Sequence, residues 1–395
     1  MQDHDVVVVG AGPAGLSTAI SLAQAGLRVA VIERQGQPSI AAPAPDGRDI
    51  ALTNGSRQIL TRLGAWQRFD AEDVAPMSAA HVLDGDSRAG LHFGVATARQ
   101  EALGFLVANH VIRKALYDIA IAQPQIAFYC GQGVAGVRSD GGSAAAILDN
   151  GERVSGKLLV AADSRFSQTR TLMGIGADTV AFGKTMLVFR MAQERPHQQT
   201  AYECFKYGYT LASLPLNGLR ASIVLTVPTD EATHFIDMAP DALSRLVEEA
   251  FDHRFGAMKL ETGRFAYPLT GVFARRFVGK RYALAGDAAV GMHPVTAHGF
   301  NFGLLGQATL AAMIRAALTA GEDIGGDKLL LAYEARHRRA TLPLFVATNA
   351  IVRLYTTDTP PARFARSALV RAAERFGPAK RLIMAQLGDR GRDVA

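Results

Sequence analysis

The chain lacks several residue patterns that define common protein classes. Its two cysteines, Cys130 and Cys204, are far apart in the sequence, so a disulfide framework is excluded and a reducing compartment is expected. No C-x-x-C or H-E-x-x-H pattern suggests zinc, and no G-x-S-x-G pattern suggests a hydrolase. We therefore expect no metal site.

Long apolar runs are also missing, and we expect no segment that spans a membrane. The first apolar run, Val6–Val9, is short and follows Asp3 and Asp5 instead of the basic start of a signal peptide. The net charge of +6 allows contact with anionic lipid or acidic partners. Because no nucleic-acid-binding motif accompanies this charge, nucleic acid is not an expected partner. These features predict a cytoplasmic protein, with peripheral contact to the inner face of the membrane as an alternative.

The N-terminus carries the most informative pattern. Val6–Val9 predicts a buried strand, and Gly10, Gly12 and Gly15 follow it with G-x-G-x-x-G spacing. A helical apolar stripe comes next, and a second strand then ends at Glu33, 23 residues after the first glycine, close to the roughly 20 expected. The glycine pattern alone is weak, but this order of strand, turn, helix, strand and acid is the context that a dinucleotide site requires.

Each residue type in this pattern has a physical reason. Gly10 permits a tight turn, Gly12 lets a diphosphate approach the backbone, and Gly15 lets the helix pack closely on the sheet. The positive end of the helix then faces the phosphates, and Glu33 accepts hydrogen bonds from a ribose. Arg34 either reaches the nucleotide or stays solvated. The alternative is an ordinary strand–helix–strand turn.

A second informative stretch runs from Tyr282 through the long apolar helix that begins near Asn301. Asp287 follows a short strand and a glycine, which suits a carboxylate that accepts hydrogen bonds from sugar or ribityl hydroxyls. Gly299 allows the backbone to lie against a flat ring, and the positive helix end can approach it. His298 can donate or accept a proton near neutral pH, although a histidine that only hydrogen-bonds its loop is the favoured interpretation. The alternative for the whole stretch is a loop that caps a core helix.

Four polar residues elsewhere are further candidates. Arg48 follows an Asp-Gly turn and either reaches a cofactor or is solvated. Asn109 stands where a helix begins, so it either caps that helix or contacts the cofactor. Arg113 lies one turn later, and Asp163 follows a buried strand.

The glycines at 131, 133 and 136 also match G-x-G-x-x-G, but turn signals and short strands follow them instead of a helix. We expect a β-meander there. From Gly183 to Thr270, strands joined by Pro- or Gly-containing turns predict an antiparallel sheet. This sheet forms a second lobe inserted into the first.

Four segments give the chain a resemblance to a known family: VVVVGAGPAGLS with its IER, DGRDIAL, VAADSRFSQTR and LAGDAAVGMHPVTAHGFNFGL. The chain resembles the single-component FAD monooxygenases that hydroxylate aromatic rings, and within them the hydroxylases of ubiquinone biosynthesis. The string HPVTAHGFNFGL is most similar to the demethoxyubiquinol hydroxylases. The likeness reaches from the N-terminus to about residue 310.

This resemblance implies an α/β fold like that of para-hydroxybenzoate hydroxylase, with a Rossmann-like FAD lobe, an inserted substrate lobe and a C-terminal helical segment. The implied FAD-binding domain comprises residues 1–75, 106–178 and 276–350, the substrate domain residues 76–105 and 179–275, and the helical region residues 351–395. The cofactor-binding residues implied are Gly10, Gly12, Gly15, Glu33, Arg34, Arg48, Asn109, Arg113, Asp163, Asp287, Gly299, Phe300 and Asn301.

The implied reaction uses NAD(P)H to reduce FAD, and O2 then supplies the hydroxyl group that enters an electron-rich ring. No second nucleotide-binding unit follows, so NAD(P)H docks transiently, and enzymes that hydroxylate nitrogen or insert oxygen into ketones are excluded. A flavin halogenase would carry W-x-W, whereas Trp66 is the single tryptophan.

Two positions depart from the family pattern. Asp163-Ser164 replaces the usual Asp-Gly, which affects a left-handed backbone position. Ala297-His298-Gly299 replaces Gly-Gln-Gly, so the resemblance gives His298 no role, and it stays a catalytic candidate from its chemistry alone.

Near the C-terminus, Pro360–Asp393 mixes apolar and basic residues. Such a helix either lies on an anionic membrane or packs on the body of the protein.

The expected partners are a polyprenyl phenol or quinol and a ubiquinone-biosynthesis complex. Three alternatives are a hydroxylase of a soluble phenol or polyketide, a flavin-binding scaffold without turnover, and a reductase of prenyl double bonds. The ring carbon, the choice of NADH or NADPH, the catalytic base and the oligomeric state stay open.

Overall fold

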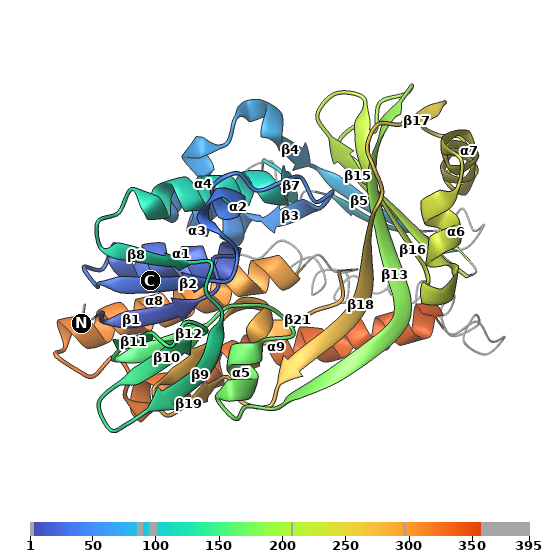
Figure 1. Ribbon diagram of the computed structural model, residues 1–395. Helices are drawn as coiled ribbons and strands as arrows, with labels where there is room; N and C mark the ends of the chain where they lie inside the picture. Colours follow the sequence, from blue (N-terminus) through green and yellow to red (C-terminus); the bar gives the residue numbers. More distant parts are fainter. Residues whose placement is uncertain (1–3, 85–89, 95–100, 207, 295–297, 357–395) are drawn as a thin grey trace.

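The computed structural model describes residues 4–84, 90–94, 101–206, 208–294 and 298–356 (Figure 1). Two lobes lie side by side in this view, and each is built on its own β-sheet. The predicted α/β fold, with an antiparallel lobe inserted into a Rossmann-like lobe, is confirmed.

The first-lobe sheet is six-stranded among the described residues, in the order β19-β20-β12-β1-β2-β8. Its pairings are parallel except for β19 with β20. The four valines of β1 are buried because this strand lies between β12 and β2 with side chains packed on both faces. The strands are β1 (Val6–Val9), β2 (Val29–Glu33), β8 (Ile126–Cys130), β12 (Leu158–Ala161), β19 (Val278–Gly279) and β20 (Tyr282–Leu284).

Helices α1 (Pro13–Ala23), α4 (Asn109–Ile121) and α8 (Gly299–Thr319) share one hydrophobic core with one face of this sheet. The opposite face packs on the sheet of β9 (Val134–Ser139), β10 (Ala144–Leu148) and β11 (Arg153–Gly156). These three strands pair antiparallel. The predicted β-meander after the second glycine string is therefore confirmed.

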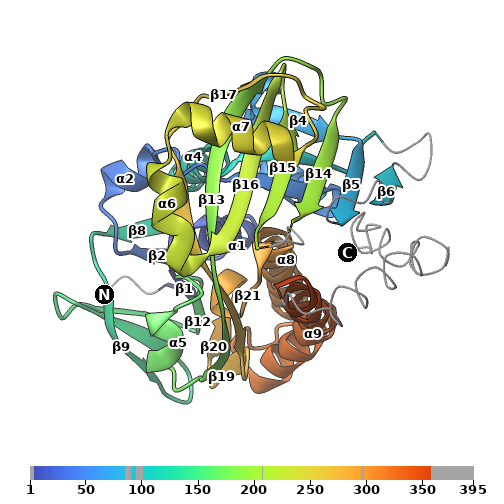
Figure 2. The ribbon, with the colours of Figure 1, turned by 90° about the vertical axis from the view of Figure 1, so that its right-hand side faces the viewer.

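The second-lobe sheet is nine-stranded in the described part of the chain, with the path β21-β18-β13-β16-β15-β14-β5-β6 and β17 beside β13. Helices α6 (Ala232–Asp237) and α7 (Pro240–Ala250) cover its outer face (Figure 2). The strands are β5 (Ala79–Asp84), β6 (Gly90–Gly94), β13 (Ala177–Gln193), β14 (Thr200–Phe205), β15 (Thr210–Leu216), β16 (Arg220–Pro228), β17 (Met258–Leu260), β18 (Phe265–Ala274) and β21 (Val290–Gly291). The expected domain boundaries stay predictions. Strand β13 (Ala177–Gln193) continues without a break through the boundary expected after residue 178.

A small antiparallel sheet of β3 (Asp49–Thr53), β7 (Gly104–Ala108) and β4 (Val74–Met77) lies between the lobes. Buried side chains of Ala75 and Leu106 pack there against Leu216 of the second-lobe sheet. The remaining helices are α2 (Gln37–Ala41), α3 (Asn54–Leu63), α5 (Gln168–Leu172) and α9 (Asp327–Thr356).

Helix α8, with 21 residues, is long and apolar enough to cross a membrane by length and composition, so the expectation that no apolar stretch reaches that length was wrong. In the structure this helix belongs to the core, where Leu304, Leu310 and Ile314 are buried against α1 and the first-lobe sheet. Helix α9 reaches Thr356, and the expected basic helix at Pro360–Asp393 lies outside the described residues.

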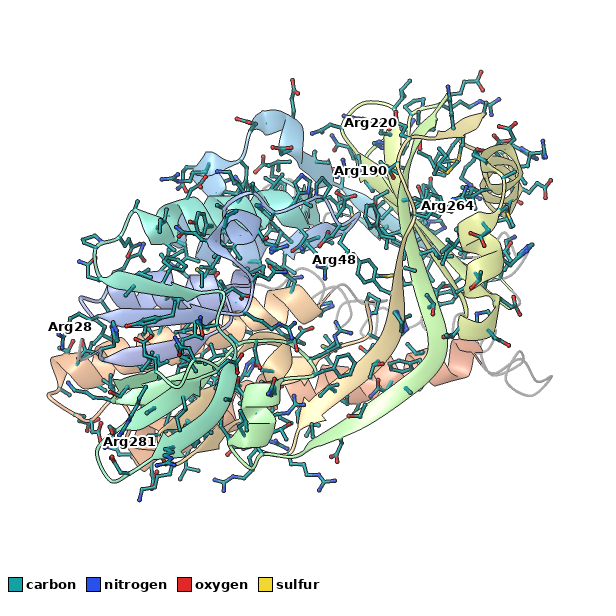
Figure 3. The ribbon with its side chains drawn as sticks, viewed as in Figure 1. Arg28, Arg48, Arg190, Arg220, Arg264 and Arg281 are labelled. Carbon is teal, nitrogen blue, oxygen red and sulfur yellow. The ribbon has the colours of Figure 1, made fainter. Side chains whose placement is uncertain are left out.

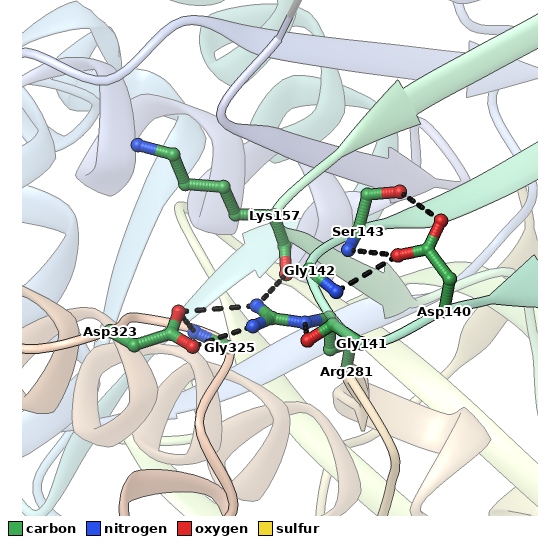
Figure 4. A network of polar contacts seen from close by, with 8 residues as sticks. All are labelled: Asp140, Gly141, Gly142, Ser143, Lys157, Arg281, Asp323 and Gly325. Atoms are coloured by element: carbon green, nitrogen blue, oxygen red, sulfur yellow. Dashed lines mark hydrogen bonds and ion pairs between the residues drawn. The ribbon is translucent and has the colours of Figure 1, made fainter.

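Arg281 joins three segments at the edge of the first lobe (Figure 4). Its guanidinium forms a bidentate ion pair with Asp323, at 2.6 and 3.1 Å, and donates to the carbonyls of Lys157 and Gly141 at 3.0 and 3.1 Å. The side chain is 11% exposed, so these carbonyls would lose their partner if it were removed. The network holds the β9–β10 turn and the α8–α9 connection against the start of β12.

We expect Arg281→Ala to lower the free energy of unfolding by about 1–3 kcal/mol, because a largely buried charged donor with four contacts is lost. Arg275→Ala is the matched control, since Arg275 pairs with Asp178 while both side chains are about 70% exposed, and we expect it to cost less than about 0.5 kcal/mol. Urea unfolding followed by circular dichroism measures both. Equal effects of the two substitutions would contradict the role given to Arg281.

Candidate functional site

The turn after β1 brings α1 unusually close to the sheet. Gly10 has a φ of +106°, and a Cβ there would lie 2.6 Å from the carbonyl oxygen of Ala162. A Cβ on Gly15 would collide with the carbonyl oxygen of Gly10. Both glycines are therefore needed for packing, as the sequence predicted.

Gly12 is the N-cap residue of α1, and unlike Gly10 and Gly15 it is not needed for packing. A Cβ on Gly12 would meet no atom within 4 Å, so the space in front of it is open. No side chain caps this helix end, its first turn has no acidic residue, and Pro13 occupies the first turn. The N–H groups and the positive helix dipole therefore point into open space that suits a diphosphate, and FAD fits this turn.

Glu33 lies beside the same turn. Its Oε2 accepts a hydrogen bond from the Ala11 amide at 2.7 Å, and its Oε1 accepts one from the Gln35 amide at 2.9 Å. Arg113 on α4 donates to Oε1 of Gln35 at 3.5 Å, and Arg34 is exposed. The structure therefore brings the predicted acid and both arginines to the edge of the sheet where the glycine turn lies.

The Asp287 turn packs directly on the N-terminus of α1, although more than half of the chain separates the two segments. Gly286 has a φ of +60°, and a Cβ there would lie 2.6 Å from the Cβ of Ala14. Asp287 accepts a hydrogen bond from Arg165 at 2.9 Å, and Arg165 also donates to the carbonyl of Thr270 at 3.1 Å. Arg165 lies within the VAADSRFSQTR segment, but it was not among the predicted residues.

Arg48 lies between the lobes (Figure 3). It pairs with Asp46 at 2.5 Å, and its guanidinium lies 5.2 Å from the centre of the Tyr267 ring. Burial acts to raise the pKa of Asp46, but the hydrogen bond and the positive charge of Arg48 outweigh burial and hold that pKa below its usual range. Asn109 donates to the same carboxylate at 2.7 Å, and its side chain does not cap α4. The helix-cap alternative for Asn109 was therefore wrong.

Asp163 is held within its own loop, where it accepts hydrogen bonds from Ser167 and from both the amide and the hydroxyl of Thr169. Ser164 stands where the family usually has glycine. Its φ is not positive, so the backbone here does not adopt the left-handed conformation that glycine would allow. The role of Asp163 toward a cofactor stays a prediction.

The start of α8 contains the last group of predicted residues. Asn301 accepts from the Thr53 amide at 3.0 Å and donates to the Ala51 carbonyl at 2.9 Å, so it fastens α8 to β3. His298 is buried as the N-cap of α8, with its ring centre 5.7 Å from that of Phe302. Gly299 and Phe300 are half-buried. Ala297, which was part of the predicted departure, lies outside the described residues.

Comparison with known proteins identifies the family of the chain. A family model for an FAD-binding domain matches residues 3–344. Ubiquinone hydroxylase UbiM of Neisseria meningitidis is 44% identical over 387 residues, which cover 97% of this chain and 84% of that protein. The chain belongs to the FAD-dependent ubiquinone hydroxylase family. Ubiquinone hydroxylase UbiL of Rhodospirillum rubrum is 35% identical over 380 residues, covering 96% and 88% of the two chains.

A solved structure supports the fold of this hydroxylase. The p-nitrophenol 4-monooxygenase PnpA of Pseudomonas putida superposes with a TM-score of 0.77 at 20% identity and covers 99% of this chain and 100% of its own. Within the described residues, no group of three or more His, Cys, Asp or Glu side chains is placed to hold a metal ion. The predicted family, its FAD monooxygenase activity and its cofactor are confirmed.

The two glycines of the turn give a matched test of the FAD site. We expect Gly12→Ala to change the stability of the apoprotein by less than about 0.5 kcal/mol, because its Cβ meets open space. The same methyl group would occupy the position of the diphosphate, so FAD affinity should fall at least about tenfold. Fluorescence titration with FAD measures this loss.

Gly15→Ala is the contrasting variant, because its Cβ would collide with Gly10. It should destabilise the apoprotein by about 1–3 kcal/mol, which thermal unfolding of the two apoproteins measures. If Gly12→Ala binds FAD as tightly as the wild type, the diphosphate does not lie at this helix end.

Proposed function

We propose that this enzyme hydroxylates the aromatic ring of a polyprenylated ubiquinone precursor, using NAD(P)H and O2. One observation supports this most directly. Strand β21 begins three residues after Asp287, and it pairs with β18 of the second-lobe sheet through Val290–Phe273 and Gly291–Val272. A flavin held between α1 and the Asp287 turn therefore ends beside the second lobe.

That part of the second lobe carries apolar side chains. Met186, Val188 and Leu269 form a buried cluster on the face of the sheet opposite α6 and α7, with Val224 and Tyr267 packed against it. An apolar wall suits a prenylated ring better than a small charged phenol. The relatives named as ubiquinone hydroxylases support the same substrate class.

The chain's own residues have separate tasks in this reaction. The N-terminus of α1 would bind the diphosphate of FAD, Glu33 would accept hydrogen bonds from its ribose, and Asp287 would accept from ribityl hydroxyls while Arg165 orients that carboxylate. When bound, FAD takes up reducing equivalents from NAD(P)H and, with O2, supplies the oxygen that enters the ring.

The seam between the lobes is closed by polar contacts. Asp49, whose side chain is 1% exposed, forms a bidentate ion pair with Arg190 at 2.6 and 3.2 Å. Tyr267 donates to the Asp46 carbonyl at 2.7 Å. These contacts hold the second lobe against the first and help exclude water from the reacting groups.

A polyprenyl substrate is membrane-bound before it reacts, so we also propose a cytoplasmic enzyme that attaches peripherally to the inner face of the membrane and works within a ubiquinone-biosynthesis complex. The expected basic helix at Pro360–Asp393 is the candidate contact. Flotation of the full chain with anionic liposomes, compared with a chain ending before Pro360, tests the attachment. Equal flotation of both chains would contradict it.

The activity itself is tested with the purified FAD enzyme, NADH or NADPH, ¹⁸O₂ and 2-prenylphenol. We expect a product that contains one ¹⁸O atom, with a kcat/KM at least roughly tenfold above that for the soluble phenol 4-hydroxybenzoate, because the prenyl group gains apolar contacts. Mass spectrometry of the product is the readout, since NAD(P)H loss alone also reports uncoupled oxidation. Faster hydroxylation of 4-hydroxybenzoate would favour the soluble-phenol alternative.

A further inference from the structure

Strand β14 carries a carboxylate on the face of the second-lobe sheet that is turned away from α6 and α7. Tyr202 and Cys204 belong to or pack on the outer core, where the ring centre of Tyr202 lies 5.4 Å from that of Phe255. Because successive side chains of a strand point to opposite faces, Glu203 points to the other face. We call this the inner face of the sheet.

The inner face is the one that meets the first lobe. Tyr267 of β18 donates from this face to the Asp46 carbonyl, and Arg190 of β13 pairs with Asp49. Figure 2 shows the same arrangement, with α6 and α7 on the near side of the sheet and the first lobe and α8 behind it. Glu203 is therefore on the side of the sheet where the flavin lies under the proposed function.

The row of side chains across the sheet at Glu203 is otherwise apolar. Strand pairing sets Glu203 between Val82 of β5 and Ala212 of β15. Ala212 pairs with Val224, and Val224 with Val188. The carboxylate is thus one polar group in a row of aliphatic side chains, a costly placement for which the described residues show no structural reason.

The surroundings act on the ionisation of this carboxyl. Burial raises the pKa of Glu203 to about 8, although its side chain is only half-buried against solvent. The carboxyl is therefore surrounded by protein but is not fully shielded from solvent. Among the described residues, no hydrogen bond or ion pair engages it.

Other charged groups on the inner face are engaged elsewhere. Alternation places Lys184, Arg190 and Arg220 on this face, where Lys184 donates to the Gly208 carbonyl at 3.3 Å and Arg220 to the Asn217 carbonyl at 3.4 Å. Arg190 is paired with Asp49. From the first lobe, Asp46 and Asp49 face the same seam and are bound by their arginines. Within the described part of the chain, Glu203 differs from these groups in having no hydrogen bond or ion pair.

We propose that Glu203 is a catalytic residue that accepts the phenolic proton of the ring substrate. This inference rests on the proposed function and names the base for that reaction. The proton moves from the phenol oxygen to a carboxylate oxygen of Glu203, and the electron pair of the broken O–H bond stays on the substrate oxygen. The phenolate then has greater electron density at its ring carbons, which is what attack on an electrophilic oxygen requires.

An ordinary carboxylate is a weak base toward a phenol of pKa about 10, whereas a carboxylate with a raised pKa is closer in pKa to the phenol and is a stronger base.

The test compares wild type and Glu203→Gln over pH in the ¹⁸O₂ assay with 2-prenylphenol. The wild-type kcat/KM should rise with pH through about 8, because the carboxylate form is the active one. Glu203→Gln should lose this rise and be at least about 100-fold slower above it, while its FAD spectrum is unchanged. Glu249→Gln, on the exposed outer side of α7, is the matched control and should follow the wild type.

Each outcome decides something. Hydroxylation by Glu203→Gln at the wild-type rate, with the same pH profile, overturns this inference and leaves the proposed function intact. A flat wild-type profile around pH 8 overturns it even if the variant fails to fold. A wild type that makes no hydroxylated product from the prenylated phenol overturns the proposed function, and this inference with it.

Stability gives an independent readout of the same group. Its pKa rises from 4.5 in the unfolded chain to about 8 in the folded one. The stability that the neutral carboxyl contributes is therefore fully present below pH 4.5 and is lost as pH rises through about 8. The melting temperature of Glu203→Gln, relative to wild type, should increase between about pH 6 and about pH 9. A constant difference would mean that Glu203 is not buried in the folded holoenzyme.

Discussion

Contact between the first turn of α1 and the carboxyl end of β1 is the constraint on which the site depends. A single methyl group on Gly15 would collide with the Gly10 carbonyl, and one on Gly286 would press on Ala14. These close approaches bring two segments from opposite ends of the chain to the same helix end. Because Gly12 faces open space there, the helix dipole and free N–H groups are left for an anion. The fold thus uses glycine both to close the packing and to leave a place for the cofactor.

The second lobe is tied to this place by arginines. Arg165 bonds Asp287 with one nitrogen and the Thr270 carbonyl of β18 with another. Arg48 links Asp46 to the Tyr267 ring, and Arg190 reaches Asp49. Arg165 and Arg48 each contact groups from two segments, and Arg190 forms a bidentate pair with one carboxylate, which a planar group with five donors does better than lysine. The position of the cofactor turn relative to the inner face of the second-lobe sheet is therefore set by charge-assisted contacts as well as by the short β18–β21 pairing.

The sequence predicted the site residues best where their role depends on the local backbone conformation of one segment. The glycine turn, Glu33 and the Asp287 turn were readable because a fixed spacing serves a fixed geometry, and the β-meander was readable from its turn residues. Contacts between distant segments were not. Nothing in the sequence indicates that Asn109 donates to Asp46 or that Asn301 fastens α8 to β3. Arg165 was missed because an arginine after a strand is ordinary until its partner is known. The prediction that no apolar stretch reaches membrane length missed α8, whose length and composition are those of a membrane span although it is a core helix.

The carboxylates at this seam show how environment divides one functional group into different chemical roles. Asp46 lies against Arg48, which holds its pKa below the usual range, and Asp287 is paired with Arg165. Glu203 lies among Val82, Ala212 and Val224, where burial favours the neutral form. Moving a proton to and from a phenol at ordinary pH requires the second kind of carboxyl, because a carboxyl with a lowered pKa, such as that of Asp46, is too acidic to hold the proton. Under the proposed function, the apolar face that would receive a prenylated ring would also make Glu203 basic enough to act on it.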